Sequence, residues 1–232
     1  MRSDSSANLP QREWGRFGVL LVALLVQLAV LPFLPGDPAG GIFFRLSWTL
    51  VVLAGLLIAS RNRTVLWVAL ALGIPSLILR WTGGSNDQAA AQLALTLSGA
   101  VFLIFTAGVV LKTIYLERRV KLDEIFGGVL VYILLGVIFG QVHYALEIAN
   151  PGAYLLGDVA LSSIPSNADG NLIFSFLYYS FTTLTTLGYG DIRPALHASR
   201  MLSTGEALTG QLYLAIFIAR LVGSYLSQKD DS

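Results

Sequence analysis

Six long apolar stretches, joined by short polar connections, are the feature that most limits what this chain can fold into. A helix needs about 20 apolar residues to cross the roughly 30 Å hydrocarbon core of a bilayer. The stretches together predict a membrane protein with six transmembrane helices. They are Phe17–Leu34, Ile42–Ser60, Val65–Leu79, Ala89–Leu111, Ile125–Leu146 and Met201–Leu226.

The composition agrees with a chain that lies in lipid. Of its 232 residues, 55% are hydrophobic and 12% are charged, whereas about a quarter of an average soluble domain is charged. The surplus of apolar residues argues against a soluble enzyme and against disorder. The chain has no cysteine, which excludes disulfides, thiolate nucleophiles and cysteine-ligated metals. No nucleophile–base pair and no metal-ligand cluster falls at one membrane depth, so we expect no enzyme activity.

A seventh apolar stretch, Leu172–Leu187, is too short and too rich in hydroxyl groups to span the bilayer. Non-helical backbone at membrane depth is tolerated only where protein surrounds it or where it lines a water-filled cavity. We therefore predict a re-entrant helix and loop between the last two spans. The expected fold class is an all-α membrane protein.

The basic residues indicate the orientation of the helices. With a cytoplasmic N-terminus, eleven of the fifteen Lys and Arg residues lie on the inner side, as the positive-inside rule requires. Both termini are then cytoplasmic, and the long connection at 147–200 lies outside. The four outer basic residues are Arg45, Arg80, Arg193 and Arg200.

The re-entrant stretch leads into the run T-L-G-Y-G at residues 186–190, followed by Asp191. This run closely resembles the T-V-G-Y-G selectivity filter of the potassium channel family, with leucine in place of valine. Such a filter replaces the hydration shell of an ion with rings of backbone carbonyl oxygens. Turning successive carbonyls toward one axis needs left-handed backbone, which explains Gly188 and Gly190.

The resemblance implies a six-transmembrane, one-pore-loop channel of the prokaryotic type. A filter of fourfold carbonyl rings needs four strands, and this chain supplies one without an internal repeat, so a homotetramer is expected. Asp191 would lie at the outer mouth, and the side chains at 187 and 189 would point away from the ion pathway. The expected K+ ligands are Thr186, Leu187, Gly188 and Tyr189, with Gly190 completing the filter.

The resemblance also implies supporting roles for residues that precede the filter. Tyr178 and Tyr179 take the place of aromatic residues that surround the filter, and one of them is expected to form a hydrogen bond with Asp191. Interfacial anchoring is the alternative for these tyrosines. Thr182 and Thr185 either bond to the filter or are ordinary satisfied hydroxyls in a crowded helix.

The sixth span contains the candidate inner pore. Gly210 takes the place of an inner-helix glycine often discussed as a gating hinge, and helix packing through a small residue is the alternative. The residues that follow at helical spacing are candidates for the cavity and the inner constriction. They are Gln211, Leu214, Ile218 and Val222.

Two polar residues and a pair of glycines inside the spans need an explanation. A carboxylate at Glu206 is costly in the membrane unless it is paired. It supports the filter, faces the cavity, or pairs with Arg200 or a pore-helix hydroxyl. His143 is either a proton sensor or a tolerated interfacial histidine. Gly136 and Gly140 form a GxxxG pair that predicts close helix packing.

The six-span plan suggests a division into domains. We expect a peripheral four-helix domain at 1–113, a linker at 114–124, a pore domain at 125–226 and a short cytoplasmic tail at 227–232. Voltage sensing needs roughly three to four gating charges per subunit, and Ala89–Leu111 in the fourth span contains no Arg or Lys. A conventional voltage sensor is therefore excluded.

The segment after the fourth span combines apolar and basic residues. It is interpreted as an amphipathic interfacial linker, either bound to anionic lipid, at about 1 kcal/mol per basic residue near a charged leaflet, or simply solvated. Its basic residues are Lys112, Arg118, Arg119 and Lys121.

These features favour a potassium-selective channel in the plasma membrane, which for a chain of this type is the bacterial inner membrane. No cofactor other than the permeant K+ ions, no organic substrate and no nucleic acid partner is expected. A weakly selective cation channel is one alternative. A non-conducting membrane scaffold with a vestigial filter is another.

Overall fold

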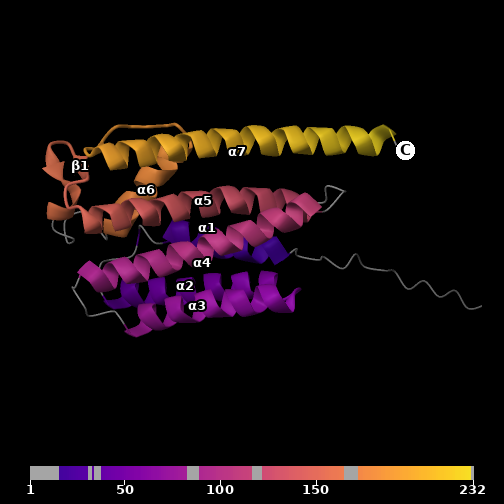
Figure 1. Cartoon of the computed structure of the whole chain (residues 1–232), viewed down its shortest axis with the longest axis horizontal. Helices are drawn as coiled ribbons and strands as arrows, with labels where there is room; N and C mark the ends of the chain where they lie inside the picture. The colour runs from indigo at the N-terminus through magenta and orange to yellow at the C-terminus, as the bar shows by residue number, and fades with distance from the viewer. Residues whose placement is uncertain are drawn as a thin grey trace, which may run out of the picture.

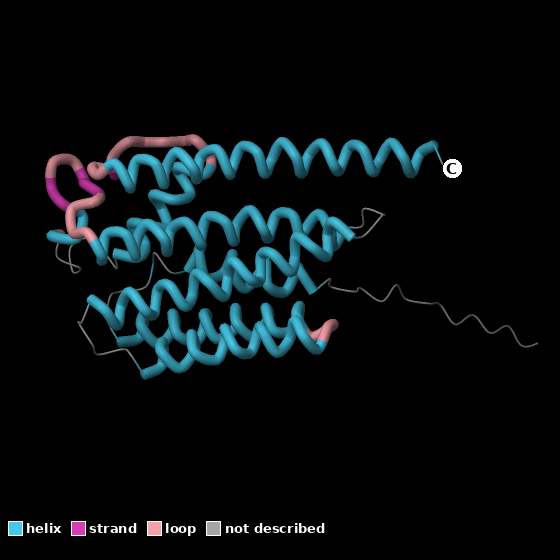
Figure 2. Tube along the Cα trace, in the orientation of Figure 1, coloured by secondary structure: helices cyan, strands magenta, loops and turns pink. Residues whose placement is uncertain are grey.

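The computed structural model describes residues 16–30, 33, 38–82, 89–116, 122–164 and 172–230. Helices make up most of this part of the chain, and they run roughly side by side (Figures 1 and 2). The helices are α1 (Arg16–Val30), α2 (Pro38–Ala59), α3 (Arg63–Thr82), α4 (Ala89–Leu116), α5 (Leu122–Ala149), α6 (Leu172–Leu184) and α7 (His197–Asp230). The strands are β1 (Tyr154–Leu156), β2 (Val159–Ala160) and β3 (Ile192–Pro194).

Five helices in the described residues are long and apolar enough to cross a membrane, namely α2, α3, α4, α5 and α7. The chain is therefore a multi-pass membrane protein, as predicted. Helix α1 has only 15 residues, and residues 31, 32 and 34 of the predicted first span lie outside the described part. The sixth span thus stays a prediction. Helix α6 is short and apolar, in agreement with a re-entrant helix.

Helix α5 is the centre of the arrangement. It packs against α1 and α4 on one side and against α6 and α7 on the other, while α2 and α3 lie farther out (Figure 1). Side chains from α1, α2, α4 and α5 form one apolar core, with Leu20, Trp48, Phe102 and Leu130 fully buried in it. Helices α1 and α4 thus pack directly on α5 of the same chain, while α2 packs on α1 and α4, and α3 packs on α2 and α4.

Gly136 and Gly140 confirm the predicted close packing in the fifth span. A Cβ on Gly136 would overlap the ring of Phe181, and one on Gly140 would lie 3.0 Å from a methyl carbon of Leu177. Both neighbours belong to α6. The missing side chains on α5 therefore let the short helix approach it closely.

A small antiparallel sheet, which the sequence did not predict, accompanies the helices of this mostly helical chain. The strand order is β2-β1-β3, and β1 pairs Tyr154 with Pro194 and Leu156 with Ile192 of β3. The hairpin of β1 and β2 is thereby joined to the chain directly after residue 191. Strands of two or three residues carry no detectable alternation of apolar and polar residues, so the sequence pattern could not predict them.

The connection after α4 is shorter than the predicted linker. Helix α4 continues to Leu116, and α5 begins at Leu122. Ile114 is buried in the apolar core of the bundle, and Lys112 is exposed on α4. Arg118, Arg119 and Lys121 lie outside the described residues, so their expected contact with lipid stays a prediction. At the other end of the chain, α7 extends through residues 227–230 of the predicted tail.

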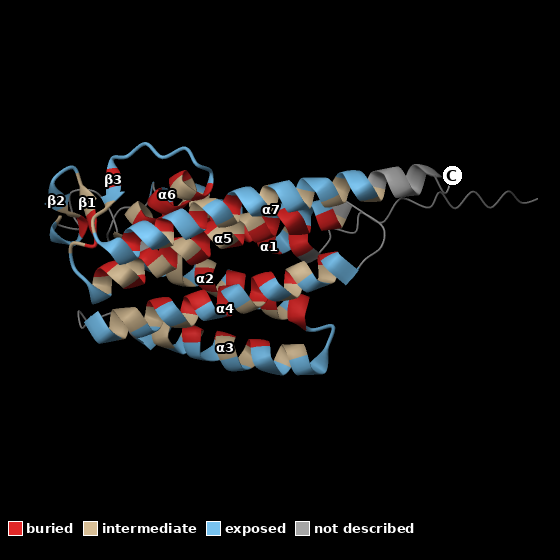
Figure 3. Cartoon of the chain, turned by 45° about the horizontal axis from the view of Figure 1, so that its top comes forward, coloured by how far each residue is buried: buried red, intermediate tan, exposed pale blue. Residues whose placement is uncertain are grey.

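Helix α7 is the least buried of the long apolar helices in the part of the chain that the structure describes. Only 6% of an 18-residue apolar stretch of α7 is buried, compared with 56% of the corresponding stretch of α5. Most of α7 is pale blue, which marks exposed residues, in Figure 3. The large apolar side chains exposed along it include Leu208, Leu212 and Ile216. This face is therefore available to lipid or to another protein chain.

Candidate functional site

The predicted filter lies in the loop that joins α6 to β3. In Figure 2 this loop is the long pink segment that runs beside the first part of α7. Every second residue in it has a positive φ: Thr186 (59°), Gly188 (55°) and Gly190 (78°). The two glycines have the left-handed backbone that the sequence predicts, whereas the left-handed Thr186 was not expected. A non-glycine residue in this region marks backbone strain, which is typical of functional segments.

Backbone hydrogen bonds fasten the first part of this loop to the end of α6. The amide of Thr186 donates to the Thr183 carbonyl at 2.9 Å, and the amide of Gly188 donates to the Thr182 carbonyl at 3.0 Å. The side-chain hydroxyl of Tyr132 on α5 donates to the Leu184 carbonyl at 3.4 Å. The loop therefore takes its position from the last turn of α6.

Tyr178 makes the hydrogen bond that the sequence predicts for one of the two tyrosines. Its hydroxyl donates to the Asp191 carboxylate at 2.7 Å. This hydrogen bond, with smaller effects of desolvation and of the nearby Asp191 charge, raises the pKa of Tyr178 to about 12. The ring of Tyr178 also stacks on Tyr189, with centroids 6.4 Å apart and planes 8° from parallel. The start and the end of the loop are thus linked through one side chain.

Tyr179 has a different role from its neighbour. Its hydroxyl lies 2.6 Å from the Ser203 hydroxyl on α7, in the buried interior. Thr182 donates to the Tyr179 carbonyl at 2.9 Å, and Thr185 donates to the Phe181 carbonyl at 2.7 Å. Both hydroxyls are therefore satisfied by backbone carbonyls of α6, in agreement with the alternative of ordinary satisfied hydroxyls.

The outward-pointing filter side chains are only partly covered in the single chain. Residues 185–191 are all exposed, with Leu187 at 56% and Tyr189 at 67% of their maximum. The stacking on Tyr178 supports one face of Tyr189, whereas Leu187 packs little. The packing of these two side chains against the filter support stays a prediction for this chain.

The inner-pore candidates follow the loop along α7. Gln211 donates from Nε2 to the Thr186 hydroxyl at 3.3 Å. Leu214 is half-buried, and Ile218 and Val222 are exposed. A Cβ on Gly210 would overlap the Leu184 carbonyl oxygen, so this glycine has a packing role at the end of α6, and its role as a hinge stays a prediction.

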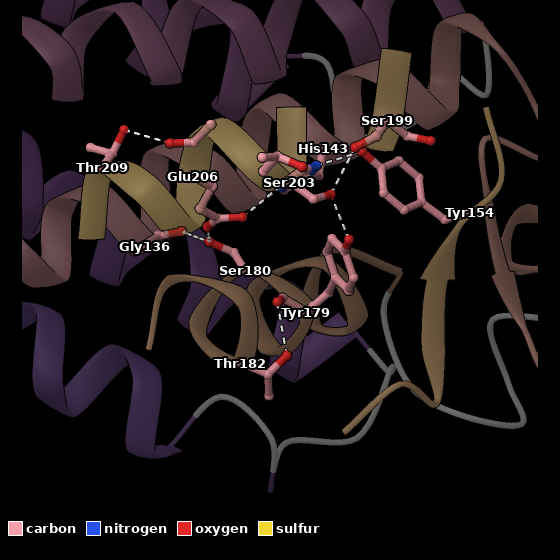
Figure 4. A network of polar contacts seen from close by, with 12 residues as sticks. Gly136, His143, Tyr154, Tyr179, Ser180, Thr182, Ser199, Ser203, Glu206 and Thr209 are labelled. Carbon is pink, nitrogen blue, oxygen red and sulfur yellow. Dashed lines mark hydrogen bonds and ion pairs between the residues drawn. The ribbon is translucent and has the colours of Figure 1, made fainter. Parts of the chain in front are cut away.

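His143 and Glu206 form a buried pair, which the sequence analysis did not predict. Both side chains are fully buried, and His143 Nε2 lies 2.8 Å from Glu206 Oε2. The hydroxyl of Ser180 on α6 contacts the other oxygen of Glu206, and the Tyr154 hydroxyl lies 2.5 Å from His143 Nδ1 (Figure 4). Glu206 therefore lies behind α6 and pairs with a pore-helix hydroxyl, whereas Arg200 donates to the Pro194 carbonyl at 3.4 Å.

Glu147 is a second buried carboxylate that the sequence analysis missed. It is 1% exposed and accepts hydrogen bonds from three backbone amides, those of Gly152 (2.9 Å), Tyr154 (2.9 Å) and Ser162 (3.2 Å). It thereby fixes the hairpin of β1 and β2 to the end of α5. The available signal was an acidic residue at the end of an apolar span, directly before a loop with Pro151 and Gly152.

Comparison with known families matches residues 128–227 to the family described as ion channel. The matched part includes most of α5, the outer sheet, α6, the loop at 185–191 and α7. It therefore covers every contact described in this subsection.

Plant potassium channels are among the curated relatives. The chain is 31% identical over 67 residues to Two-pore potassium channel 4 of Arabidopsis thaliana, and 29% identical over 80 residues to Two pore potassium channel a of Oryza sativa subsp. japonica. These matches cover 29% and 33% of this chain but 24% and 23% of the relatives. The chain thus spans about a quarter of the length of these two relatives.

A bacterial relative matches over most of its length. Protein LctB of Geobacillus stearothermophilus is 30% identical over 129 residues, which are 54% of this chain and 87% of LctB. No solved structure matches the chain significantly. From these matches, the chain belongs to the ion channel family, has relatives among potassium channels, and is a channel protein and not an enzyme.

Proposed function

We propose that this chain is one subunit of a potassium-selective channel that conducts K+ passively across the plasma membrane. The observation that carries the proposal is the loop at 186–190, which follows a short apolar helix and has positive φ at every second residue. Alternating backbone of this kind turns successive carbonyl groups the same way. Rings of such carbonyls replace the hydration shell of an ion.

The ion is the substrate of this site, and no cofactor takes part. Carbonyl oxygens of residues 186–189 and the Thr186 hydroxyl supply the ligands in the proposed filter. The C-terminal end of α6 precedes the loop directly, and the negative end of a helix dipole favours a cation there. Asp191 adds a carboxylate at the outer mouth.

The functional unit of the proposal is a homotetramer. One chain supplies one filter strand, and fourfold rings of oxygens need four. The apolar side chains exposed on α7 and the exposed Leu187 supply surface for contact with neighbouring subunits. Because α1 and α4 pack on α5 of the same chain, we propose that the peripheral helices are not exchanged between subunits. The division at 1–113, 114–124, 125–226 and 227–232 belongs to this proposal.

The proposed orientation places the outer sheet outside the cell and both termini in the cytoplasm, as the distribution of basic residues predicts. The membrane is the bacterial inner membrane. No conventional voltage sensor gates the pore. Lys112 on α4, together with Arg118, Arg119 and Lys121, remains the proposed contact for anionic lipid.

Ion flux through purified protein in liposomes tests the proposal. Wild-type protein should carry a K+ flux, and its reversal potential in mixed K+ and Na+ gradients should follow K+. Gly188→Ala should abolish the flux, because alanine rarely adopts φ of 55°. Gly152→Ala is the matched control: it introduces the same strain at φ of 88° in the outer hairpin, and the flux should persist.

The other two readings of the sequence have their own outcomes in this assay. A reversal potential near zero in opposed K+ and Na+ gradients would identify a weakly selective cation channel. No flux in wild type, and no difference between wild type and Gly188→Ala, would identify a non-conducting scaffold. Either result overturns the proposed function.

A further inference from the structure

A buried chain of polar groups joins one strand and three helices, namely β1, α5, α7 and α6 (Figure 4). It starts at the Tyr154 hydroxyl on β1, passes through both ring nitrogens of His143 on α5 and both carboxyl oxygens of Glu206 on α7, and reaches Ser180 on α6. The Ser180 hydroxyl oxygen lies 2.7 Å from the Gly136 carbonyl oxygen, back on α5. The side chains of Tyr154, His143, Glu206 and Ser180 are all fully buried.

The protonation state of these groups follows from the number of protons that their contacts need. The four contacts are Tyr154 to His143, His143 to Glu206, Glu206 to Ser180, and Ser180 to the Gly136 carbonyl. Each needs one proton between its two heavy atoms. The carbonyl oxygen can only accept, and the serine hydroxyl has a single proton to donate. If Ser180 donates to the carbonyl, the Glu206 oxygen that contacts Ser180 must itself carry a proton.

One arrangement of protons fills every contact. Tyr154 donates to His143 Nδ1, His143 donates from Nε2 to Glu206 Oε2, protonated Oε1 of Glu206 donates to Ser180, and Ser180 donates to the Gly136 carbonyl. Burial raises the pKa of Tyr154 above its usual value. The phenol therefore keeps the proton that this arrangement requires.

An ion pair between His143 and Glu206 fails the same count. Imidazolium would donate from both ring nitrogens, but a carboxylate and the Gly136 carbonyl would then compete for the single proton of Ser180. One contact between two acceptors would remain in the interior. A buried charge pair also loses its hydration on both sides, so this arrangement is the less favourable of the two.

We propose that Glu206 works as a neutral carboxylic acid and that, with His143, it is the positioning residue that holds α6, and thereby the ion-selective loop, in register with α5 and α7. Ser180 lies six residues before Thr186 on the helix that leads into the loop. A displacement of Ser180 would therefore also displace the backbone that lines the proposed filter. The proposal rests on the proposed function for its effect on selectivity, but the protonation state does not depend on it.

Glutamine is the natural test of a neutral glutamic acid, because its amide has one acceptor and one donor group. In Glu206→Gln the carbonyl can accept from His143 Nε2 and the NH2 group can donate to Ser180. Glu147 offers the matched control in the same chain. All three of its partners are amide donors, so Glu147→Gln turns an NH2 group toward an N–H group, and we expect it to destabilise the protein.

Infrared spectroscopy on the purified full-length protein reads the protonation state directly. The C=O stretch of a protonated carboxylic acid lies apart from the bands of carboxylates and amides. The difference spectrum of wild type minus Glu206→Gln should contain this acid band at neutral pH. A difference spectrum with carboxylate bands instead would show that Glu206 is ionised, which would overturn the proposal even in a fully active channel.

Selectivity measurements test the positioning role. Glu206→Gln should retain the K+ over Na+ permeability ratio of wild type. Glu206→Leu leaves Ser180 and His143 unpaired and should lower the ratio roughly tenfold, which corresponds to about 1.4 kcal/mol. If Glu206→Leu has the same permeability ratio as wild type, the positioning role is contradicted. It is also contradicted if the ratio of Glu206→Gln is as low as that of Glu206→Leu.

The two proposals fail in different ways. If wild type itself does not select K+, the proposed function fails, and the infrared result still decides whether Glu206 is neutral. If Glu206→Leu does not assemble, thermal unfolding of Glu206→Gln beside Glu147→Gln replaces the selectivity comparison. We expect Glu206→Gln to unfold near the wild-type temperature and Glu147→Gln well below it, and the reverse order contradicts the proposal.

Discussion

The hydroxyl of Tyr178 lies 2.7 Å from the carboxylate of Asp191 and connects the middle of α6 to the far end of the candidate filter. The same tyrosine stacks its ring on Tyr189. Between these two contact points lies the loop with alternating φ. A loop that is exposed in the single chain thus has its outer end fixed by one side chain from its own supporting helix.

Removal of this hydroxyl should weaken the outer end of the filter. In Tyr178→Phe the ring still stacks on Tyr189, but the Asp191 carboxylate loses its donor. We expect K+ currents that decay faster during sustained opening, measured in planar bilayers. A double-mutant cycle with Asp191→Ala isolates the contact: the double variant should behave like Asp191→Ala alone, and additive effects would show that the contact contributes nothing.

The same contact predicts a dependence on alkaline pH. The protonated hydroxyl donates to Asp191, so folding raises the pKa of Tyr178 from about 10 to about 12. The stabilisation is therefore complete below pH 10 and is lost as the pH rises through about 12. The tyrosinate absorbance of wild type minus that of Tyr178→Phe should have its midpoint near the higher value. A midpoint near 10 would contradict the hydrogen bond.

Gly210 gives a prediction that concerns packing. Alanine there would bring a methyl group into the Leu184 carbonyl at the end of α6. Overpacking costs about 1–3 kcal/mol, partly offset by about 1 kcal/mol because alanine favours the helix over glycine. Gly210→Ala should therefore unfold at a lower temperature than wild type in detergent. Gly108→Ala on α4, where a Cβ meets nothing within 4 Å, should be unchanged or slightly more stable.

The parts of the site that lie close together in the sequence could be predicted from it. The short helix, the filter motif and Asp191 fall within residues 172–191, so their order along the chain already indicates their contacts. Gly136 and Gly140 could be predicted because their four-residue spacing places both on one helix face. At these positions the local sequence pattern alone indicates which residues contact one another or pack closely.

The contacts that the sequence did not predict join distant segments. His143 and Glu206 are 63 residues apart, and nothing in this spacing shows that α5 and α7 face each other there. Glu147 caps backbone amides in a loop whose fold was unknown. The strand pairing of Tyr154 with Pro194 depends on the same tertiary arrangement. His143 and Glu206 could therefore be identified from the sequence as unusual polar residues, but neither their pairing nor the role of Glu147 could.

The peripheral helices give the last prediction, which concerns voltage. Strongly voltage-dependent channels move roughly three to four charges per subunit across the membrane. Helix α4 contains no basic residue between Ala89 and Leu111, and its Lys112 is exposed beyond them. The conductance of the purified channel should therefore change only shallowly with voltage, in steps applied across planar bilayers.

Two comparisons identify the origin of any voltage dependence of the conductance that remains. If ions in the filter cause it, replacing K+ with Rb+ as the permeant ion should change it, whereas Lys112→Gln should leave it unaltered. A steep conductance–voltage curve that becomes shallow in Lys112→Gln would instead show that α4 moves through the field. That result would contradict a fixed packing of α4 on α5, because a helix packed this closely on α5 could not move independently of it.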